Sequence, residues 1–73
     1  MEVNPLEEFK LGKIRLYSEC VQRLEDMFPH KCMRSFIELF TAQVINGKAS
    51  PKDALNAIRK EWDNRRKFAI ITD

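Results

Sequence analysis

The side chains with nucleophilic potential in this 73-residue chain are two cysteines, Cys20 and Cys32, and the single histidine, His30. A catalytic thiol or hydroxyl needs a base such as imidazole within hydrogen-bond reach. The apolar pattern around Cys32 predicts that it lies on the buried face of a helix, where a thiol keeps a raised pKa and stays inert. We therefore expect no catalytic residues and a protein that is not an enzyme.

The same three residues fall short of a zinc site, which takes four ligands, commonly in close pairs. The adjacent acids Glu7 and Glu8, like Glu25 and Asp26, point to different sides of a helix and cannot share a proton. Both glycines stand alone, so no phosphate-binding loop is encoded. The sequence predicts no metal, no cofactor and no small-molecule substrate.

Two helix starts use the same chemistry, Asn4-Pro5 and Ser50-Pro51. Asn and Ser side chains accept a hydrogen bond from a free backbone N–H, and proline at the first helical position lacks an N–H that would be unpaired anyway. Pro29 restricts the residue before it and so ends the preceding helix near Phe28. Asn46-Gly47 supplies a left-handed helix stop.

These signals predict an all-α, three-helix bundle with helices at about 5–28, 30–46 and 51–67, forming one domain over residues 1–73. The short link after Asn46 makes the second and third helices an antiparallel hairpin. Gly12 weakens the first helix, whose first two turns we expect to overhang the bundle. The apolar C-terminal tail, 68–73, has three open interpretations: a helix, a strand or a docked coil.

Helical spacing gathers most apolar residues of each expected helix on one face, which together predict the core. They are Leu6, Phe9, Ile14, Leu16, Tyr17, Cys20, Val21, Leu24 and Phe28 in the first helix; Cys32, Met33, Phe36, Ile37, Leu39, Phe40 and Val44 in the second; and Ala54, Leu55, Ile58 and Trp62 in the third.

The hairpin segment, Ala42 to Trp62, resembles the helical hairpin near the carboxyl end of many bacterial solute-binding proteins. The shared features are a Gly-Lys turn, at Gly47, and a Ser-Pro-x-acid-Ala-Leu helix start, from Ser50 to Leu55. These residues make turns and caps and carry no ligand chemistry. The resemblance therefore implies a shared local structure and no shared function.

Hydrophobic residues make up 44% of the chain and charged residues 33%, which is typical of a globular domain and not of a disordered one. No apolar run approaches the roughly 20 residues of a membrane-spanning helix, and the acidic N-terminal segment does not fit a signal peptide. We expect a cytoplasmic protein in which both cysteines are reduced, buried side chains and not a disulfide.

Apolar residues exceed what a bundle of this size easily covers, and such a surplus is typical of an interface. The predicted partner-binding residues lie at the start of the first helix and in the tail: Leu6, Phe9, Leu11, Phe68, Ile70 and Ile71, with Ile45 outside the second helix's apolar face. The favoured function is a protein-protein interaction or regulatory module that binds another protein or a second copy of itself. The alternative is that these segments fold back onto the core.

A basic stripe on the last helix indicates a second function, nucleic-acid binding, because rows of Lys and Arg are typical of phosphate contacts. Its residues are Lys52, Arg59, Lys60, Arg65, Arg66 and Lys67. Asp63 and Glu61 dilute the stripe, and bases near a helix C-terminus also favour the helix dipole. The stripe is therefore compatible with a plain solvated helix as well.

Overall fold

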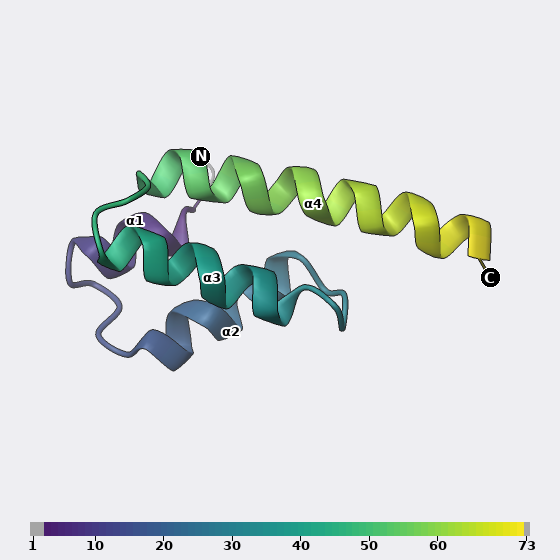
Figure 1. Ribbon diagram of the computed structural model, residues 1–73. Coiled ribbons are helices and arrows are strands. Elements are labelled where there is room, and N and C mark those ends of the chain that lie inside the picture. Colours follow the sequence, from purple (N-terminus) through teal and green to yellow (C-terminus); the bar gives the residue numbers. More distant parts are fainter. Residues whose placement is uncertain (1–2, 73) are drawn as a thin grey trace.

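The computed structural model describes the backbone of residues 3–72 and the side chains of residues 3–67. This part of the chain forms four helices: α1 (Pro5–Lys10), α2 (Tyr17–Met27), α3 (Arg34–Ile45) and α4 (Pro51–Thr72) (Figure 1). The predicted all-α bundle is confirmed. The predicted number of helices and several of their bounds are wrong.

The expected helix over 5–28 is in fact two helices separated by residues 11–16. Gly12 adopts a left-handed φ of 81°, which only glycine reaches without a steric cost. The N–H of Lys13 donates to Glu8 O at 2.9 Å and that of Gly12 to Phe9 O at 3.1 Å, the paired bonds of a Schellman motif. Gly12 therefore terminates α1 and does not merely weaken a longer helix.

The chain uses the same stop again at the end of α3. Gly47 has a φ of 73°, the N–H of Lys48 donates to Gln43 O at 2.8 Å, and that of Gly47 donates to Val44 O at 3.2 Å. The turn predicted at Asn46-Gly47 is thus confirmed. Both helices that end at a glycine do so through the same pair of hydrogen bonds.

Because the chain turns at Gly12, α1 lies back against the other helices, and the overhang predicted for it is wrong. Two hydrogen bonds of the Asn4 side chain stabilise this arrangement. Its Oδ1 accepts from the N–H of Leu6 at 3.1 Å as the predicted cap, and its Nδ2 donates across the fold to Pro51 O at 3.2 Å. One side chain therefore caps α1 and joins it to the start of α4.

The helix predicted over 30–46 begins only at Arg34. The imidazole Nδ1 of His30 accepts from the N–H of Cys32 at 3.1 Å, and the N–H of Met33 donates to His30 O at 2.9 Å. These bonds satisfy the backbone in a separate turn after Pro29. Met33 is buried as predicted, whereas Cys32, which lies in this turn before α3, is exposed and not buried as predicted.

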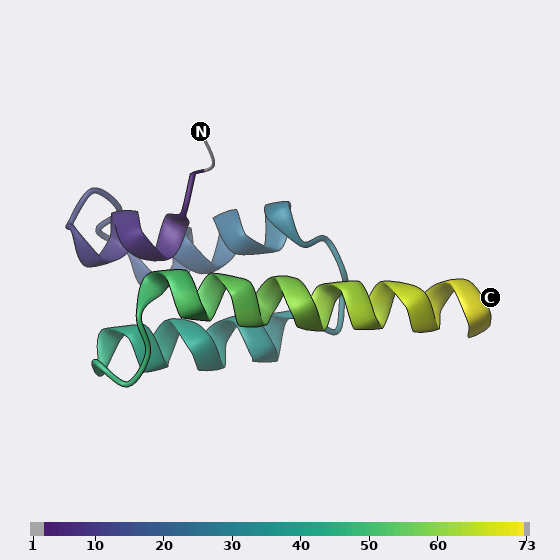
Figure 2. The ribbon, with the colours of Figure 1, turned by 90° about the horizontal axis from the view of Figure 1, so that it is seen from above.

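The hairpin of α3 and α4 is antiparallel, with its connecting loop at the same end of the molecule as the α1–α2 loop (Figures 1 and 2). Ser50 Oγ accepts from the N–H of Asp53 at 3.1 Å, so the second predicted cap is confirmed. The helix predicted over 51–67 continues to Thr72, which makes the backbone of the tail helical through that residue.

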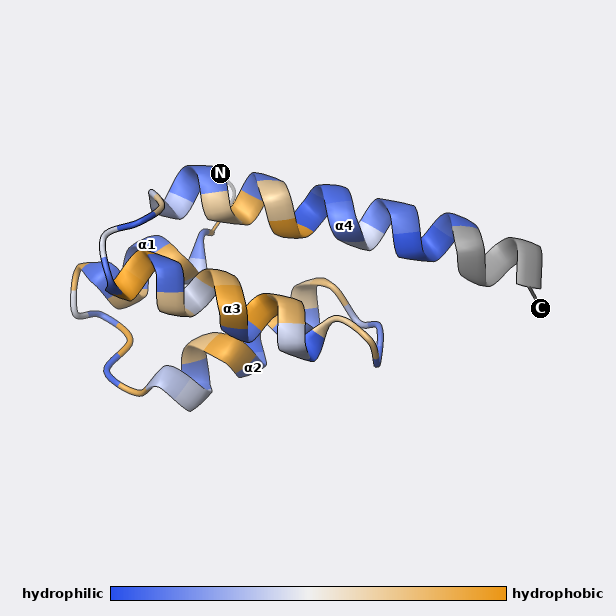
Figure 3. Cartoon of the chain, viewed as in Figure 1, coloured by the Kyte–Doolittle hydropathy of each residue, from blue (hydrophilic) through white to orange (hydrophobic). Residues whose placement is uncertain are grey.

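The core is built from all four helices and the segments between them. The buried hydrophobic residues are Leu6, Ile14, Cys20, Val21, Leu24, Phe28, Met33, Ile37, Val44, Ala54, Leu55 and Ile58. Trp62, one turn after Ile58, still packs against this core and meets the ring of Phe28 edge to face. Beyond Trp62, about 15 Å of α4 remains at 1.5 Å per residue. It projects past the other helices, and its described part is hydrophilic (Figure 3).

Besides Cys32, three further predicted core residues lie at the surface. Leu16 is 63% exposed, Leu39 is 53% exposed and Tyr17 is 38% exposed. For Leu16 and Tyr17 the cause is the break at Gly12, because the helical register counted from Pro5 does not continue into α2. No helix of residues 3–72 combines the length and the apolar character needed to cross a membrane.

Replacing Gly12 by alanine tests the role of the left-handed turn. A Cβ would meet no atom within 4 Å, so the cost comes from the backbone conformation and not from a clash. We expect Gly12→Ala to lower the free energy of unfolding by about 1 to 2 kcal/mol, measured by urea denaturation followed by circular dichroism. Gly12→Asn should cost less, and an unchanged stability of Gly12→Ala would contradict this role.

Candidate functional site

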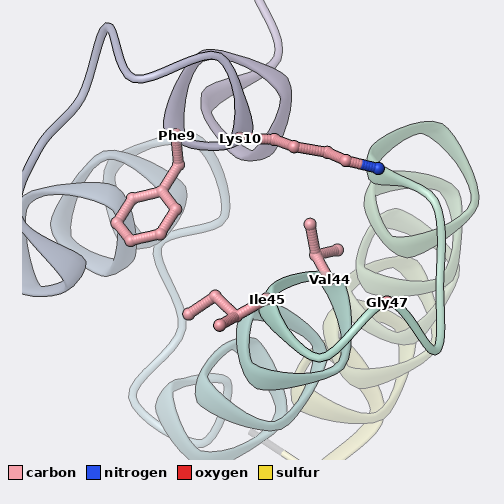
Figure 4. Close-up of a pocket in the computed structure, with 5 residues that line it drawn as sticks. All are labelled: Phe9, Lys10, Val44, Ile45 and Gly47. Atoms are coloured by element: carbon pink, nitrogen blue, oxygen red, sulfur yellow. The ribbon is translucent and has the colours of Figure 1, made fainter.

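An open groove of about 290 Å³ lies between the C-terminal ends of α1 and α3. Its lining consists of Phe9 and Lys10 from α1, Val44 and Ile45 from α3, and Gly47 (Figure 4). The Phe9 and Ile45 side chains face the same space, and Lys10 extends from α1 toward the segment that links α3 to α4. The groove thus has apolar walls and a cation at its edge.

Tyr17, the first residue of α2, lies beside this groove. Its ring meets that of Phe9 edge to face, with centroids 6.5 Å apart, and its hydroxyl donates to Glu38 O at 3.1 Å. Partial burial raises the pKa of the Tyr17 hydroxyl, and the Glu38 carboxylate adds to the rise. The hydroxyl therefore keeps its proton, and its hydrogen bond to α3, further into the alkaline range than a free tyrosine would.

The groove lies among exposed apolar side chains. Leu11 is 66% exposed directly after α1, and Ile45 is 52% exposed at the end of α3. Leu16, directly before Tyr17, is exposed as well. We call Phe9, Lys10, Leu11, Tyr17, Val44, Ile45 and Gly47 together the groove surface.

The predicted partner-binding residues differ in how far the structure buries them. Leu6 is fully buried in the core and is unavailable to a partner, because the turn at Gly12 folds α1 back. Phe9 is partly buried and lines the groove, and Leu11, which follows the lining residue Lys10 in the chain, is exposed. The tail residues Phe68, Ile70 and Ile71 lie outside the described side chains, and their role stays a prediction.

The basic stripe lies along α4, but two of its arginines form ion pairs with acidic residues of the same helix. Arg65 Nε lies 3.0 Å from Glu61 Oε1. Arg66 lies 3.6 Å from Asp63, and its guanidinium stacks 4.3 Å from the centroid of the Trp62 ring. Lys52, Lys60 and Lys67 are exposed, and Arg59 is half-buried.

The cysteines and the histidine do not converge on one site. Cys20 is buried in α2, where its thiol donates to Pro5 O at 3.6 Å, and burial raises its pKa to about 11. Cys32 is exposed, and the nearby His30 uses Nδ1 to accept a backbone N–H. Within residues 3–72, no group of three or more His, Cys, Asp or Glu side chains is arranged to hold a metal ion.

Comparison with known proteins identifies no relative of this chain. No protein-family model matches the chain. No curated protein and no solved structure matches it either. The function is therefore argued from the residues of the groove surface and of α4.

The raised pKa of Cys20 predicts how stability depends on pH at the alkaline end. The unfolded chain releases the thiol proton near pH 9.0, whereas the folded protein holds it up to about pH 11. Because the native state then binds more protons, the free energy of unfolding should fall between these values and level off above them. Urea denaturation at a series of pH values measures this fall.

The control is Cys20→Ala, which lacks the titrating thiol but keeps the other alkaline titrations. Its stability should fall less steeply than that of the native protein over the same pH range. Equal slopes in the two proteins would contradict the assignment of this pH dependence to Cys20.

Proposed function

We propose that this chain is a non-enzymatic protein-interaction or regulatory module that binds another protein, or a second copy of itself, through the groove surface. The observation that carries the proposal is a groove open to solvent and lined by Phe9 and Ile45, with Tyr17 packed against Phe9. Exposed apolar patches of this kind mark interaction sites, because leaving them in water is unfavourable.

The anatomy of the groove surface supports this proposal. Recognition surfaces commonly combine an apolar centre with a polar rim. Here Val44 and Phe9 supply the centre, and Lys10 supplies a charge at the edge. The groove lies between two helices, a setting in which a partner helix can insert its apolar face.

The open shape of the groove favours a protein partner over a small molecule. Pockets for small ligands span about 300 to 1,000 Å³ and bury most of the ligand. The volume of this groove, about 290 Å³, lies at the lower end of that range and does not distinguish the two, but the groove is open to solvent and would leave much of a small ligand exposed. An open groove suits one or two anchoring side chains of a larger partner. Without a second acid or base at its walls, it offers no pair of groups for proton transfer.

Association is tested by size-exclusion chromatography with light scattering at several protein concentrations. We expect a dimer, or a stable complex with a protein that co-purifies from the source organism. Ile45→Gln should abolish the association, because it places a polar side chain at the groove wall. A protein that stays monomeric and retains no partner in an Ile45-dependent manner would refute the proposal.

Leu39→Gln is the matched control for that experiment. Leu39 and Ile45 belong to the same helix and are 53% and 52% exposed. They lie about 120° apart around α3, and Leu39 is not part of the groove lining. Leu39→Gln should therefore leave the association unchanged, and equal losses in both variants would argue against a groove-specific contact.

A second candidate function, nucleic-acid binding, is favoured by the exposed lysines Lys52, Lys60 and Lys67 along the projecting helix α4. Lysines spaced along a helix can contact successive phosphates. The ion pairs of Arg65 and Arg66 with neighbouring acids reduce the positive charge that this helix offers. We therefore place this function second.

Fluorescence anisotropy with a labelled DNA duplex, titrated over a range of salt concentrations, tests the second candidate. If α4 binds phosphates, affinity should fall steeply with salt, and the double variant Lys60→Ala and Lys67→Ala should lower the slope of log K against log salt by about 2. Absent binding at low salt, or binding that both substitutions leave unaltered, would end this candidate.

A further inference from the structure

Basic residues predominate among the charges around the groove, although the Glu38 carboxylate lies near Tyr17 and the exposed Glu7 lies one turn before Lys10. The two segments that form this end of the molecule, residues 9–16 and 44–50, hold four basic residues and no acidic one. The basic residues are Lys10, Lys13, Arg15 and Lys48, and all four are exposed. Lys10 lines the groove, and Lys48 directly follows its lining residue Gly47.

These cations are not neutralised by the fold. Within residues 3–67, the ion pairs join other residues, and none involves the four bases at the groove. In α1, Arg23 engages Glu8 at 2.9 Å, and the exposed Glu7 forms no ion pair with any of the four bases. An apolar groove is thus bordered by positive charge that has no partner within the described part of the chain.

We propose that the groove binds an acidic amphipathic segment of a different protein, with an apolar side chain between Phe9 and Ile45 and carboxylates facing Lys10 and Lys48. This inference rests on the proposed interaction function and names its partner. Complementary charge at an interface steers the encounter and fixes the register, while the apolar anchor supplies most of the affinity.

The same charges argue against the chain's own tail as the occupant. The apolar tail residues Phe68 to Ile71 directly follow Arg65-Arg66-Lys67. Inserting this tail into the groove of a second copy would bring these bases toward Lys10 and Lys48, and like charges brought together at an interface disfavour binding. The groove is therefore better matched to a foreign acidic segment than to the tail of a second copy.

The test begins with selection of a phage-displayed library of random short peptides on the purified protein. The enriched peptides should combine large apolar residues with Asp and Glu. One such peptide, labelled with fluorescein, is then titrated by anisotropy against its counterpart in which every Asp and Glu is replaced by Lys. The acidic peptide should bind more tightly, and added salt should reduce that preference.

Charge reversal in the protein completes the test. The double variant Lys10→Glu and Lys48→Glu should lower the affinity for the acidic peptide by about tenfold or more, because two exposed ion pairs are lost and repulsion replaces them. The same variant should gain affinity for the Lys counterpart. The matched control, Lys31→Glu and Lys60→Glu, changes the net charge equally at sites away from the groove and should have a smaller effect.

The outcomes separate this inference from the function on which it rests. Three results would overturn the proposal of an acidic partner. The selection could enrich neutral or basic peptides, it could enrich none, or the two double variants could lower the affinity for the acidic peptide equally. Self-association that Ile45→Gln abolishes, with no effect of Lys10→Glu and Lys48→Glu, would also overturn it while leaving the interaction function intact. A monomer with no partner of any kind would refute both.

Discussion

The left-handed turn at Gly12 is the constraint on which the rest of the structure depends. It ends α1 after Lys10 and lets this short helix return to the bundle, where Leu6 is fully buried. A helix of six residues is not stable alone in water, so its structure relies on this packing and on the Asn4 cap. The bond from Asn4 to Pro51 then fixes α1 against α4.

The groove surface is a consequence of that arrangement. It exists because α1 and α3 both end at a glycine stop at the same end of the molecule, where their last turns lie on either side of a space they do not fill. The exposed Leu11 and the lysines of the two loops are placed there by the same stops. The left-handed glycines thus specify both the fold and the surface proposed to carry the function.

Local signals in the sequence predicted the parts of the fold that local bonds determine. The caps at Asn4 and Ser50 and the stop at Gly47 are such cases, because each involves residues only a few positions apart. Gly12 ends α1 in the same way as Gly47 ends α3, but the apolar spacing of the sequence continues across Gly12. Whether the glycine ends the helix or only destabilises a longer one is decided by the packing of Leu6 against the other helices. That packing is not a local property.

The candidate site was only partly predictable for the same reason. Phe9 and Leu11 were assigned to a surface because the first helix was expected to overhang, and Ile45 because it lies outside the apolar face of its helix. Tyr17 was assigned to the core because one helical register was carried through the break. The register errors also explain Cys32, which the late start of α3 leaves exposed. The groove is formed by residues far apart in the chain, so no local sequence pattern predicts it.

The central claim is that the groove formed by the returned helix α1 is the binding surface of this protein. Chemical-shift mapping by NMR, with the isotope-labelled protein bound to its preferred peptide, tests it most directly. The claim predicts that the perturbed amides cluster at Phe9 to Leu11 and at Val44 to Lys48. Perturbations that instead follow α4 from Lys52 to Lys67, with the groove amides unchanged, would contradict it.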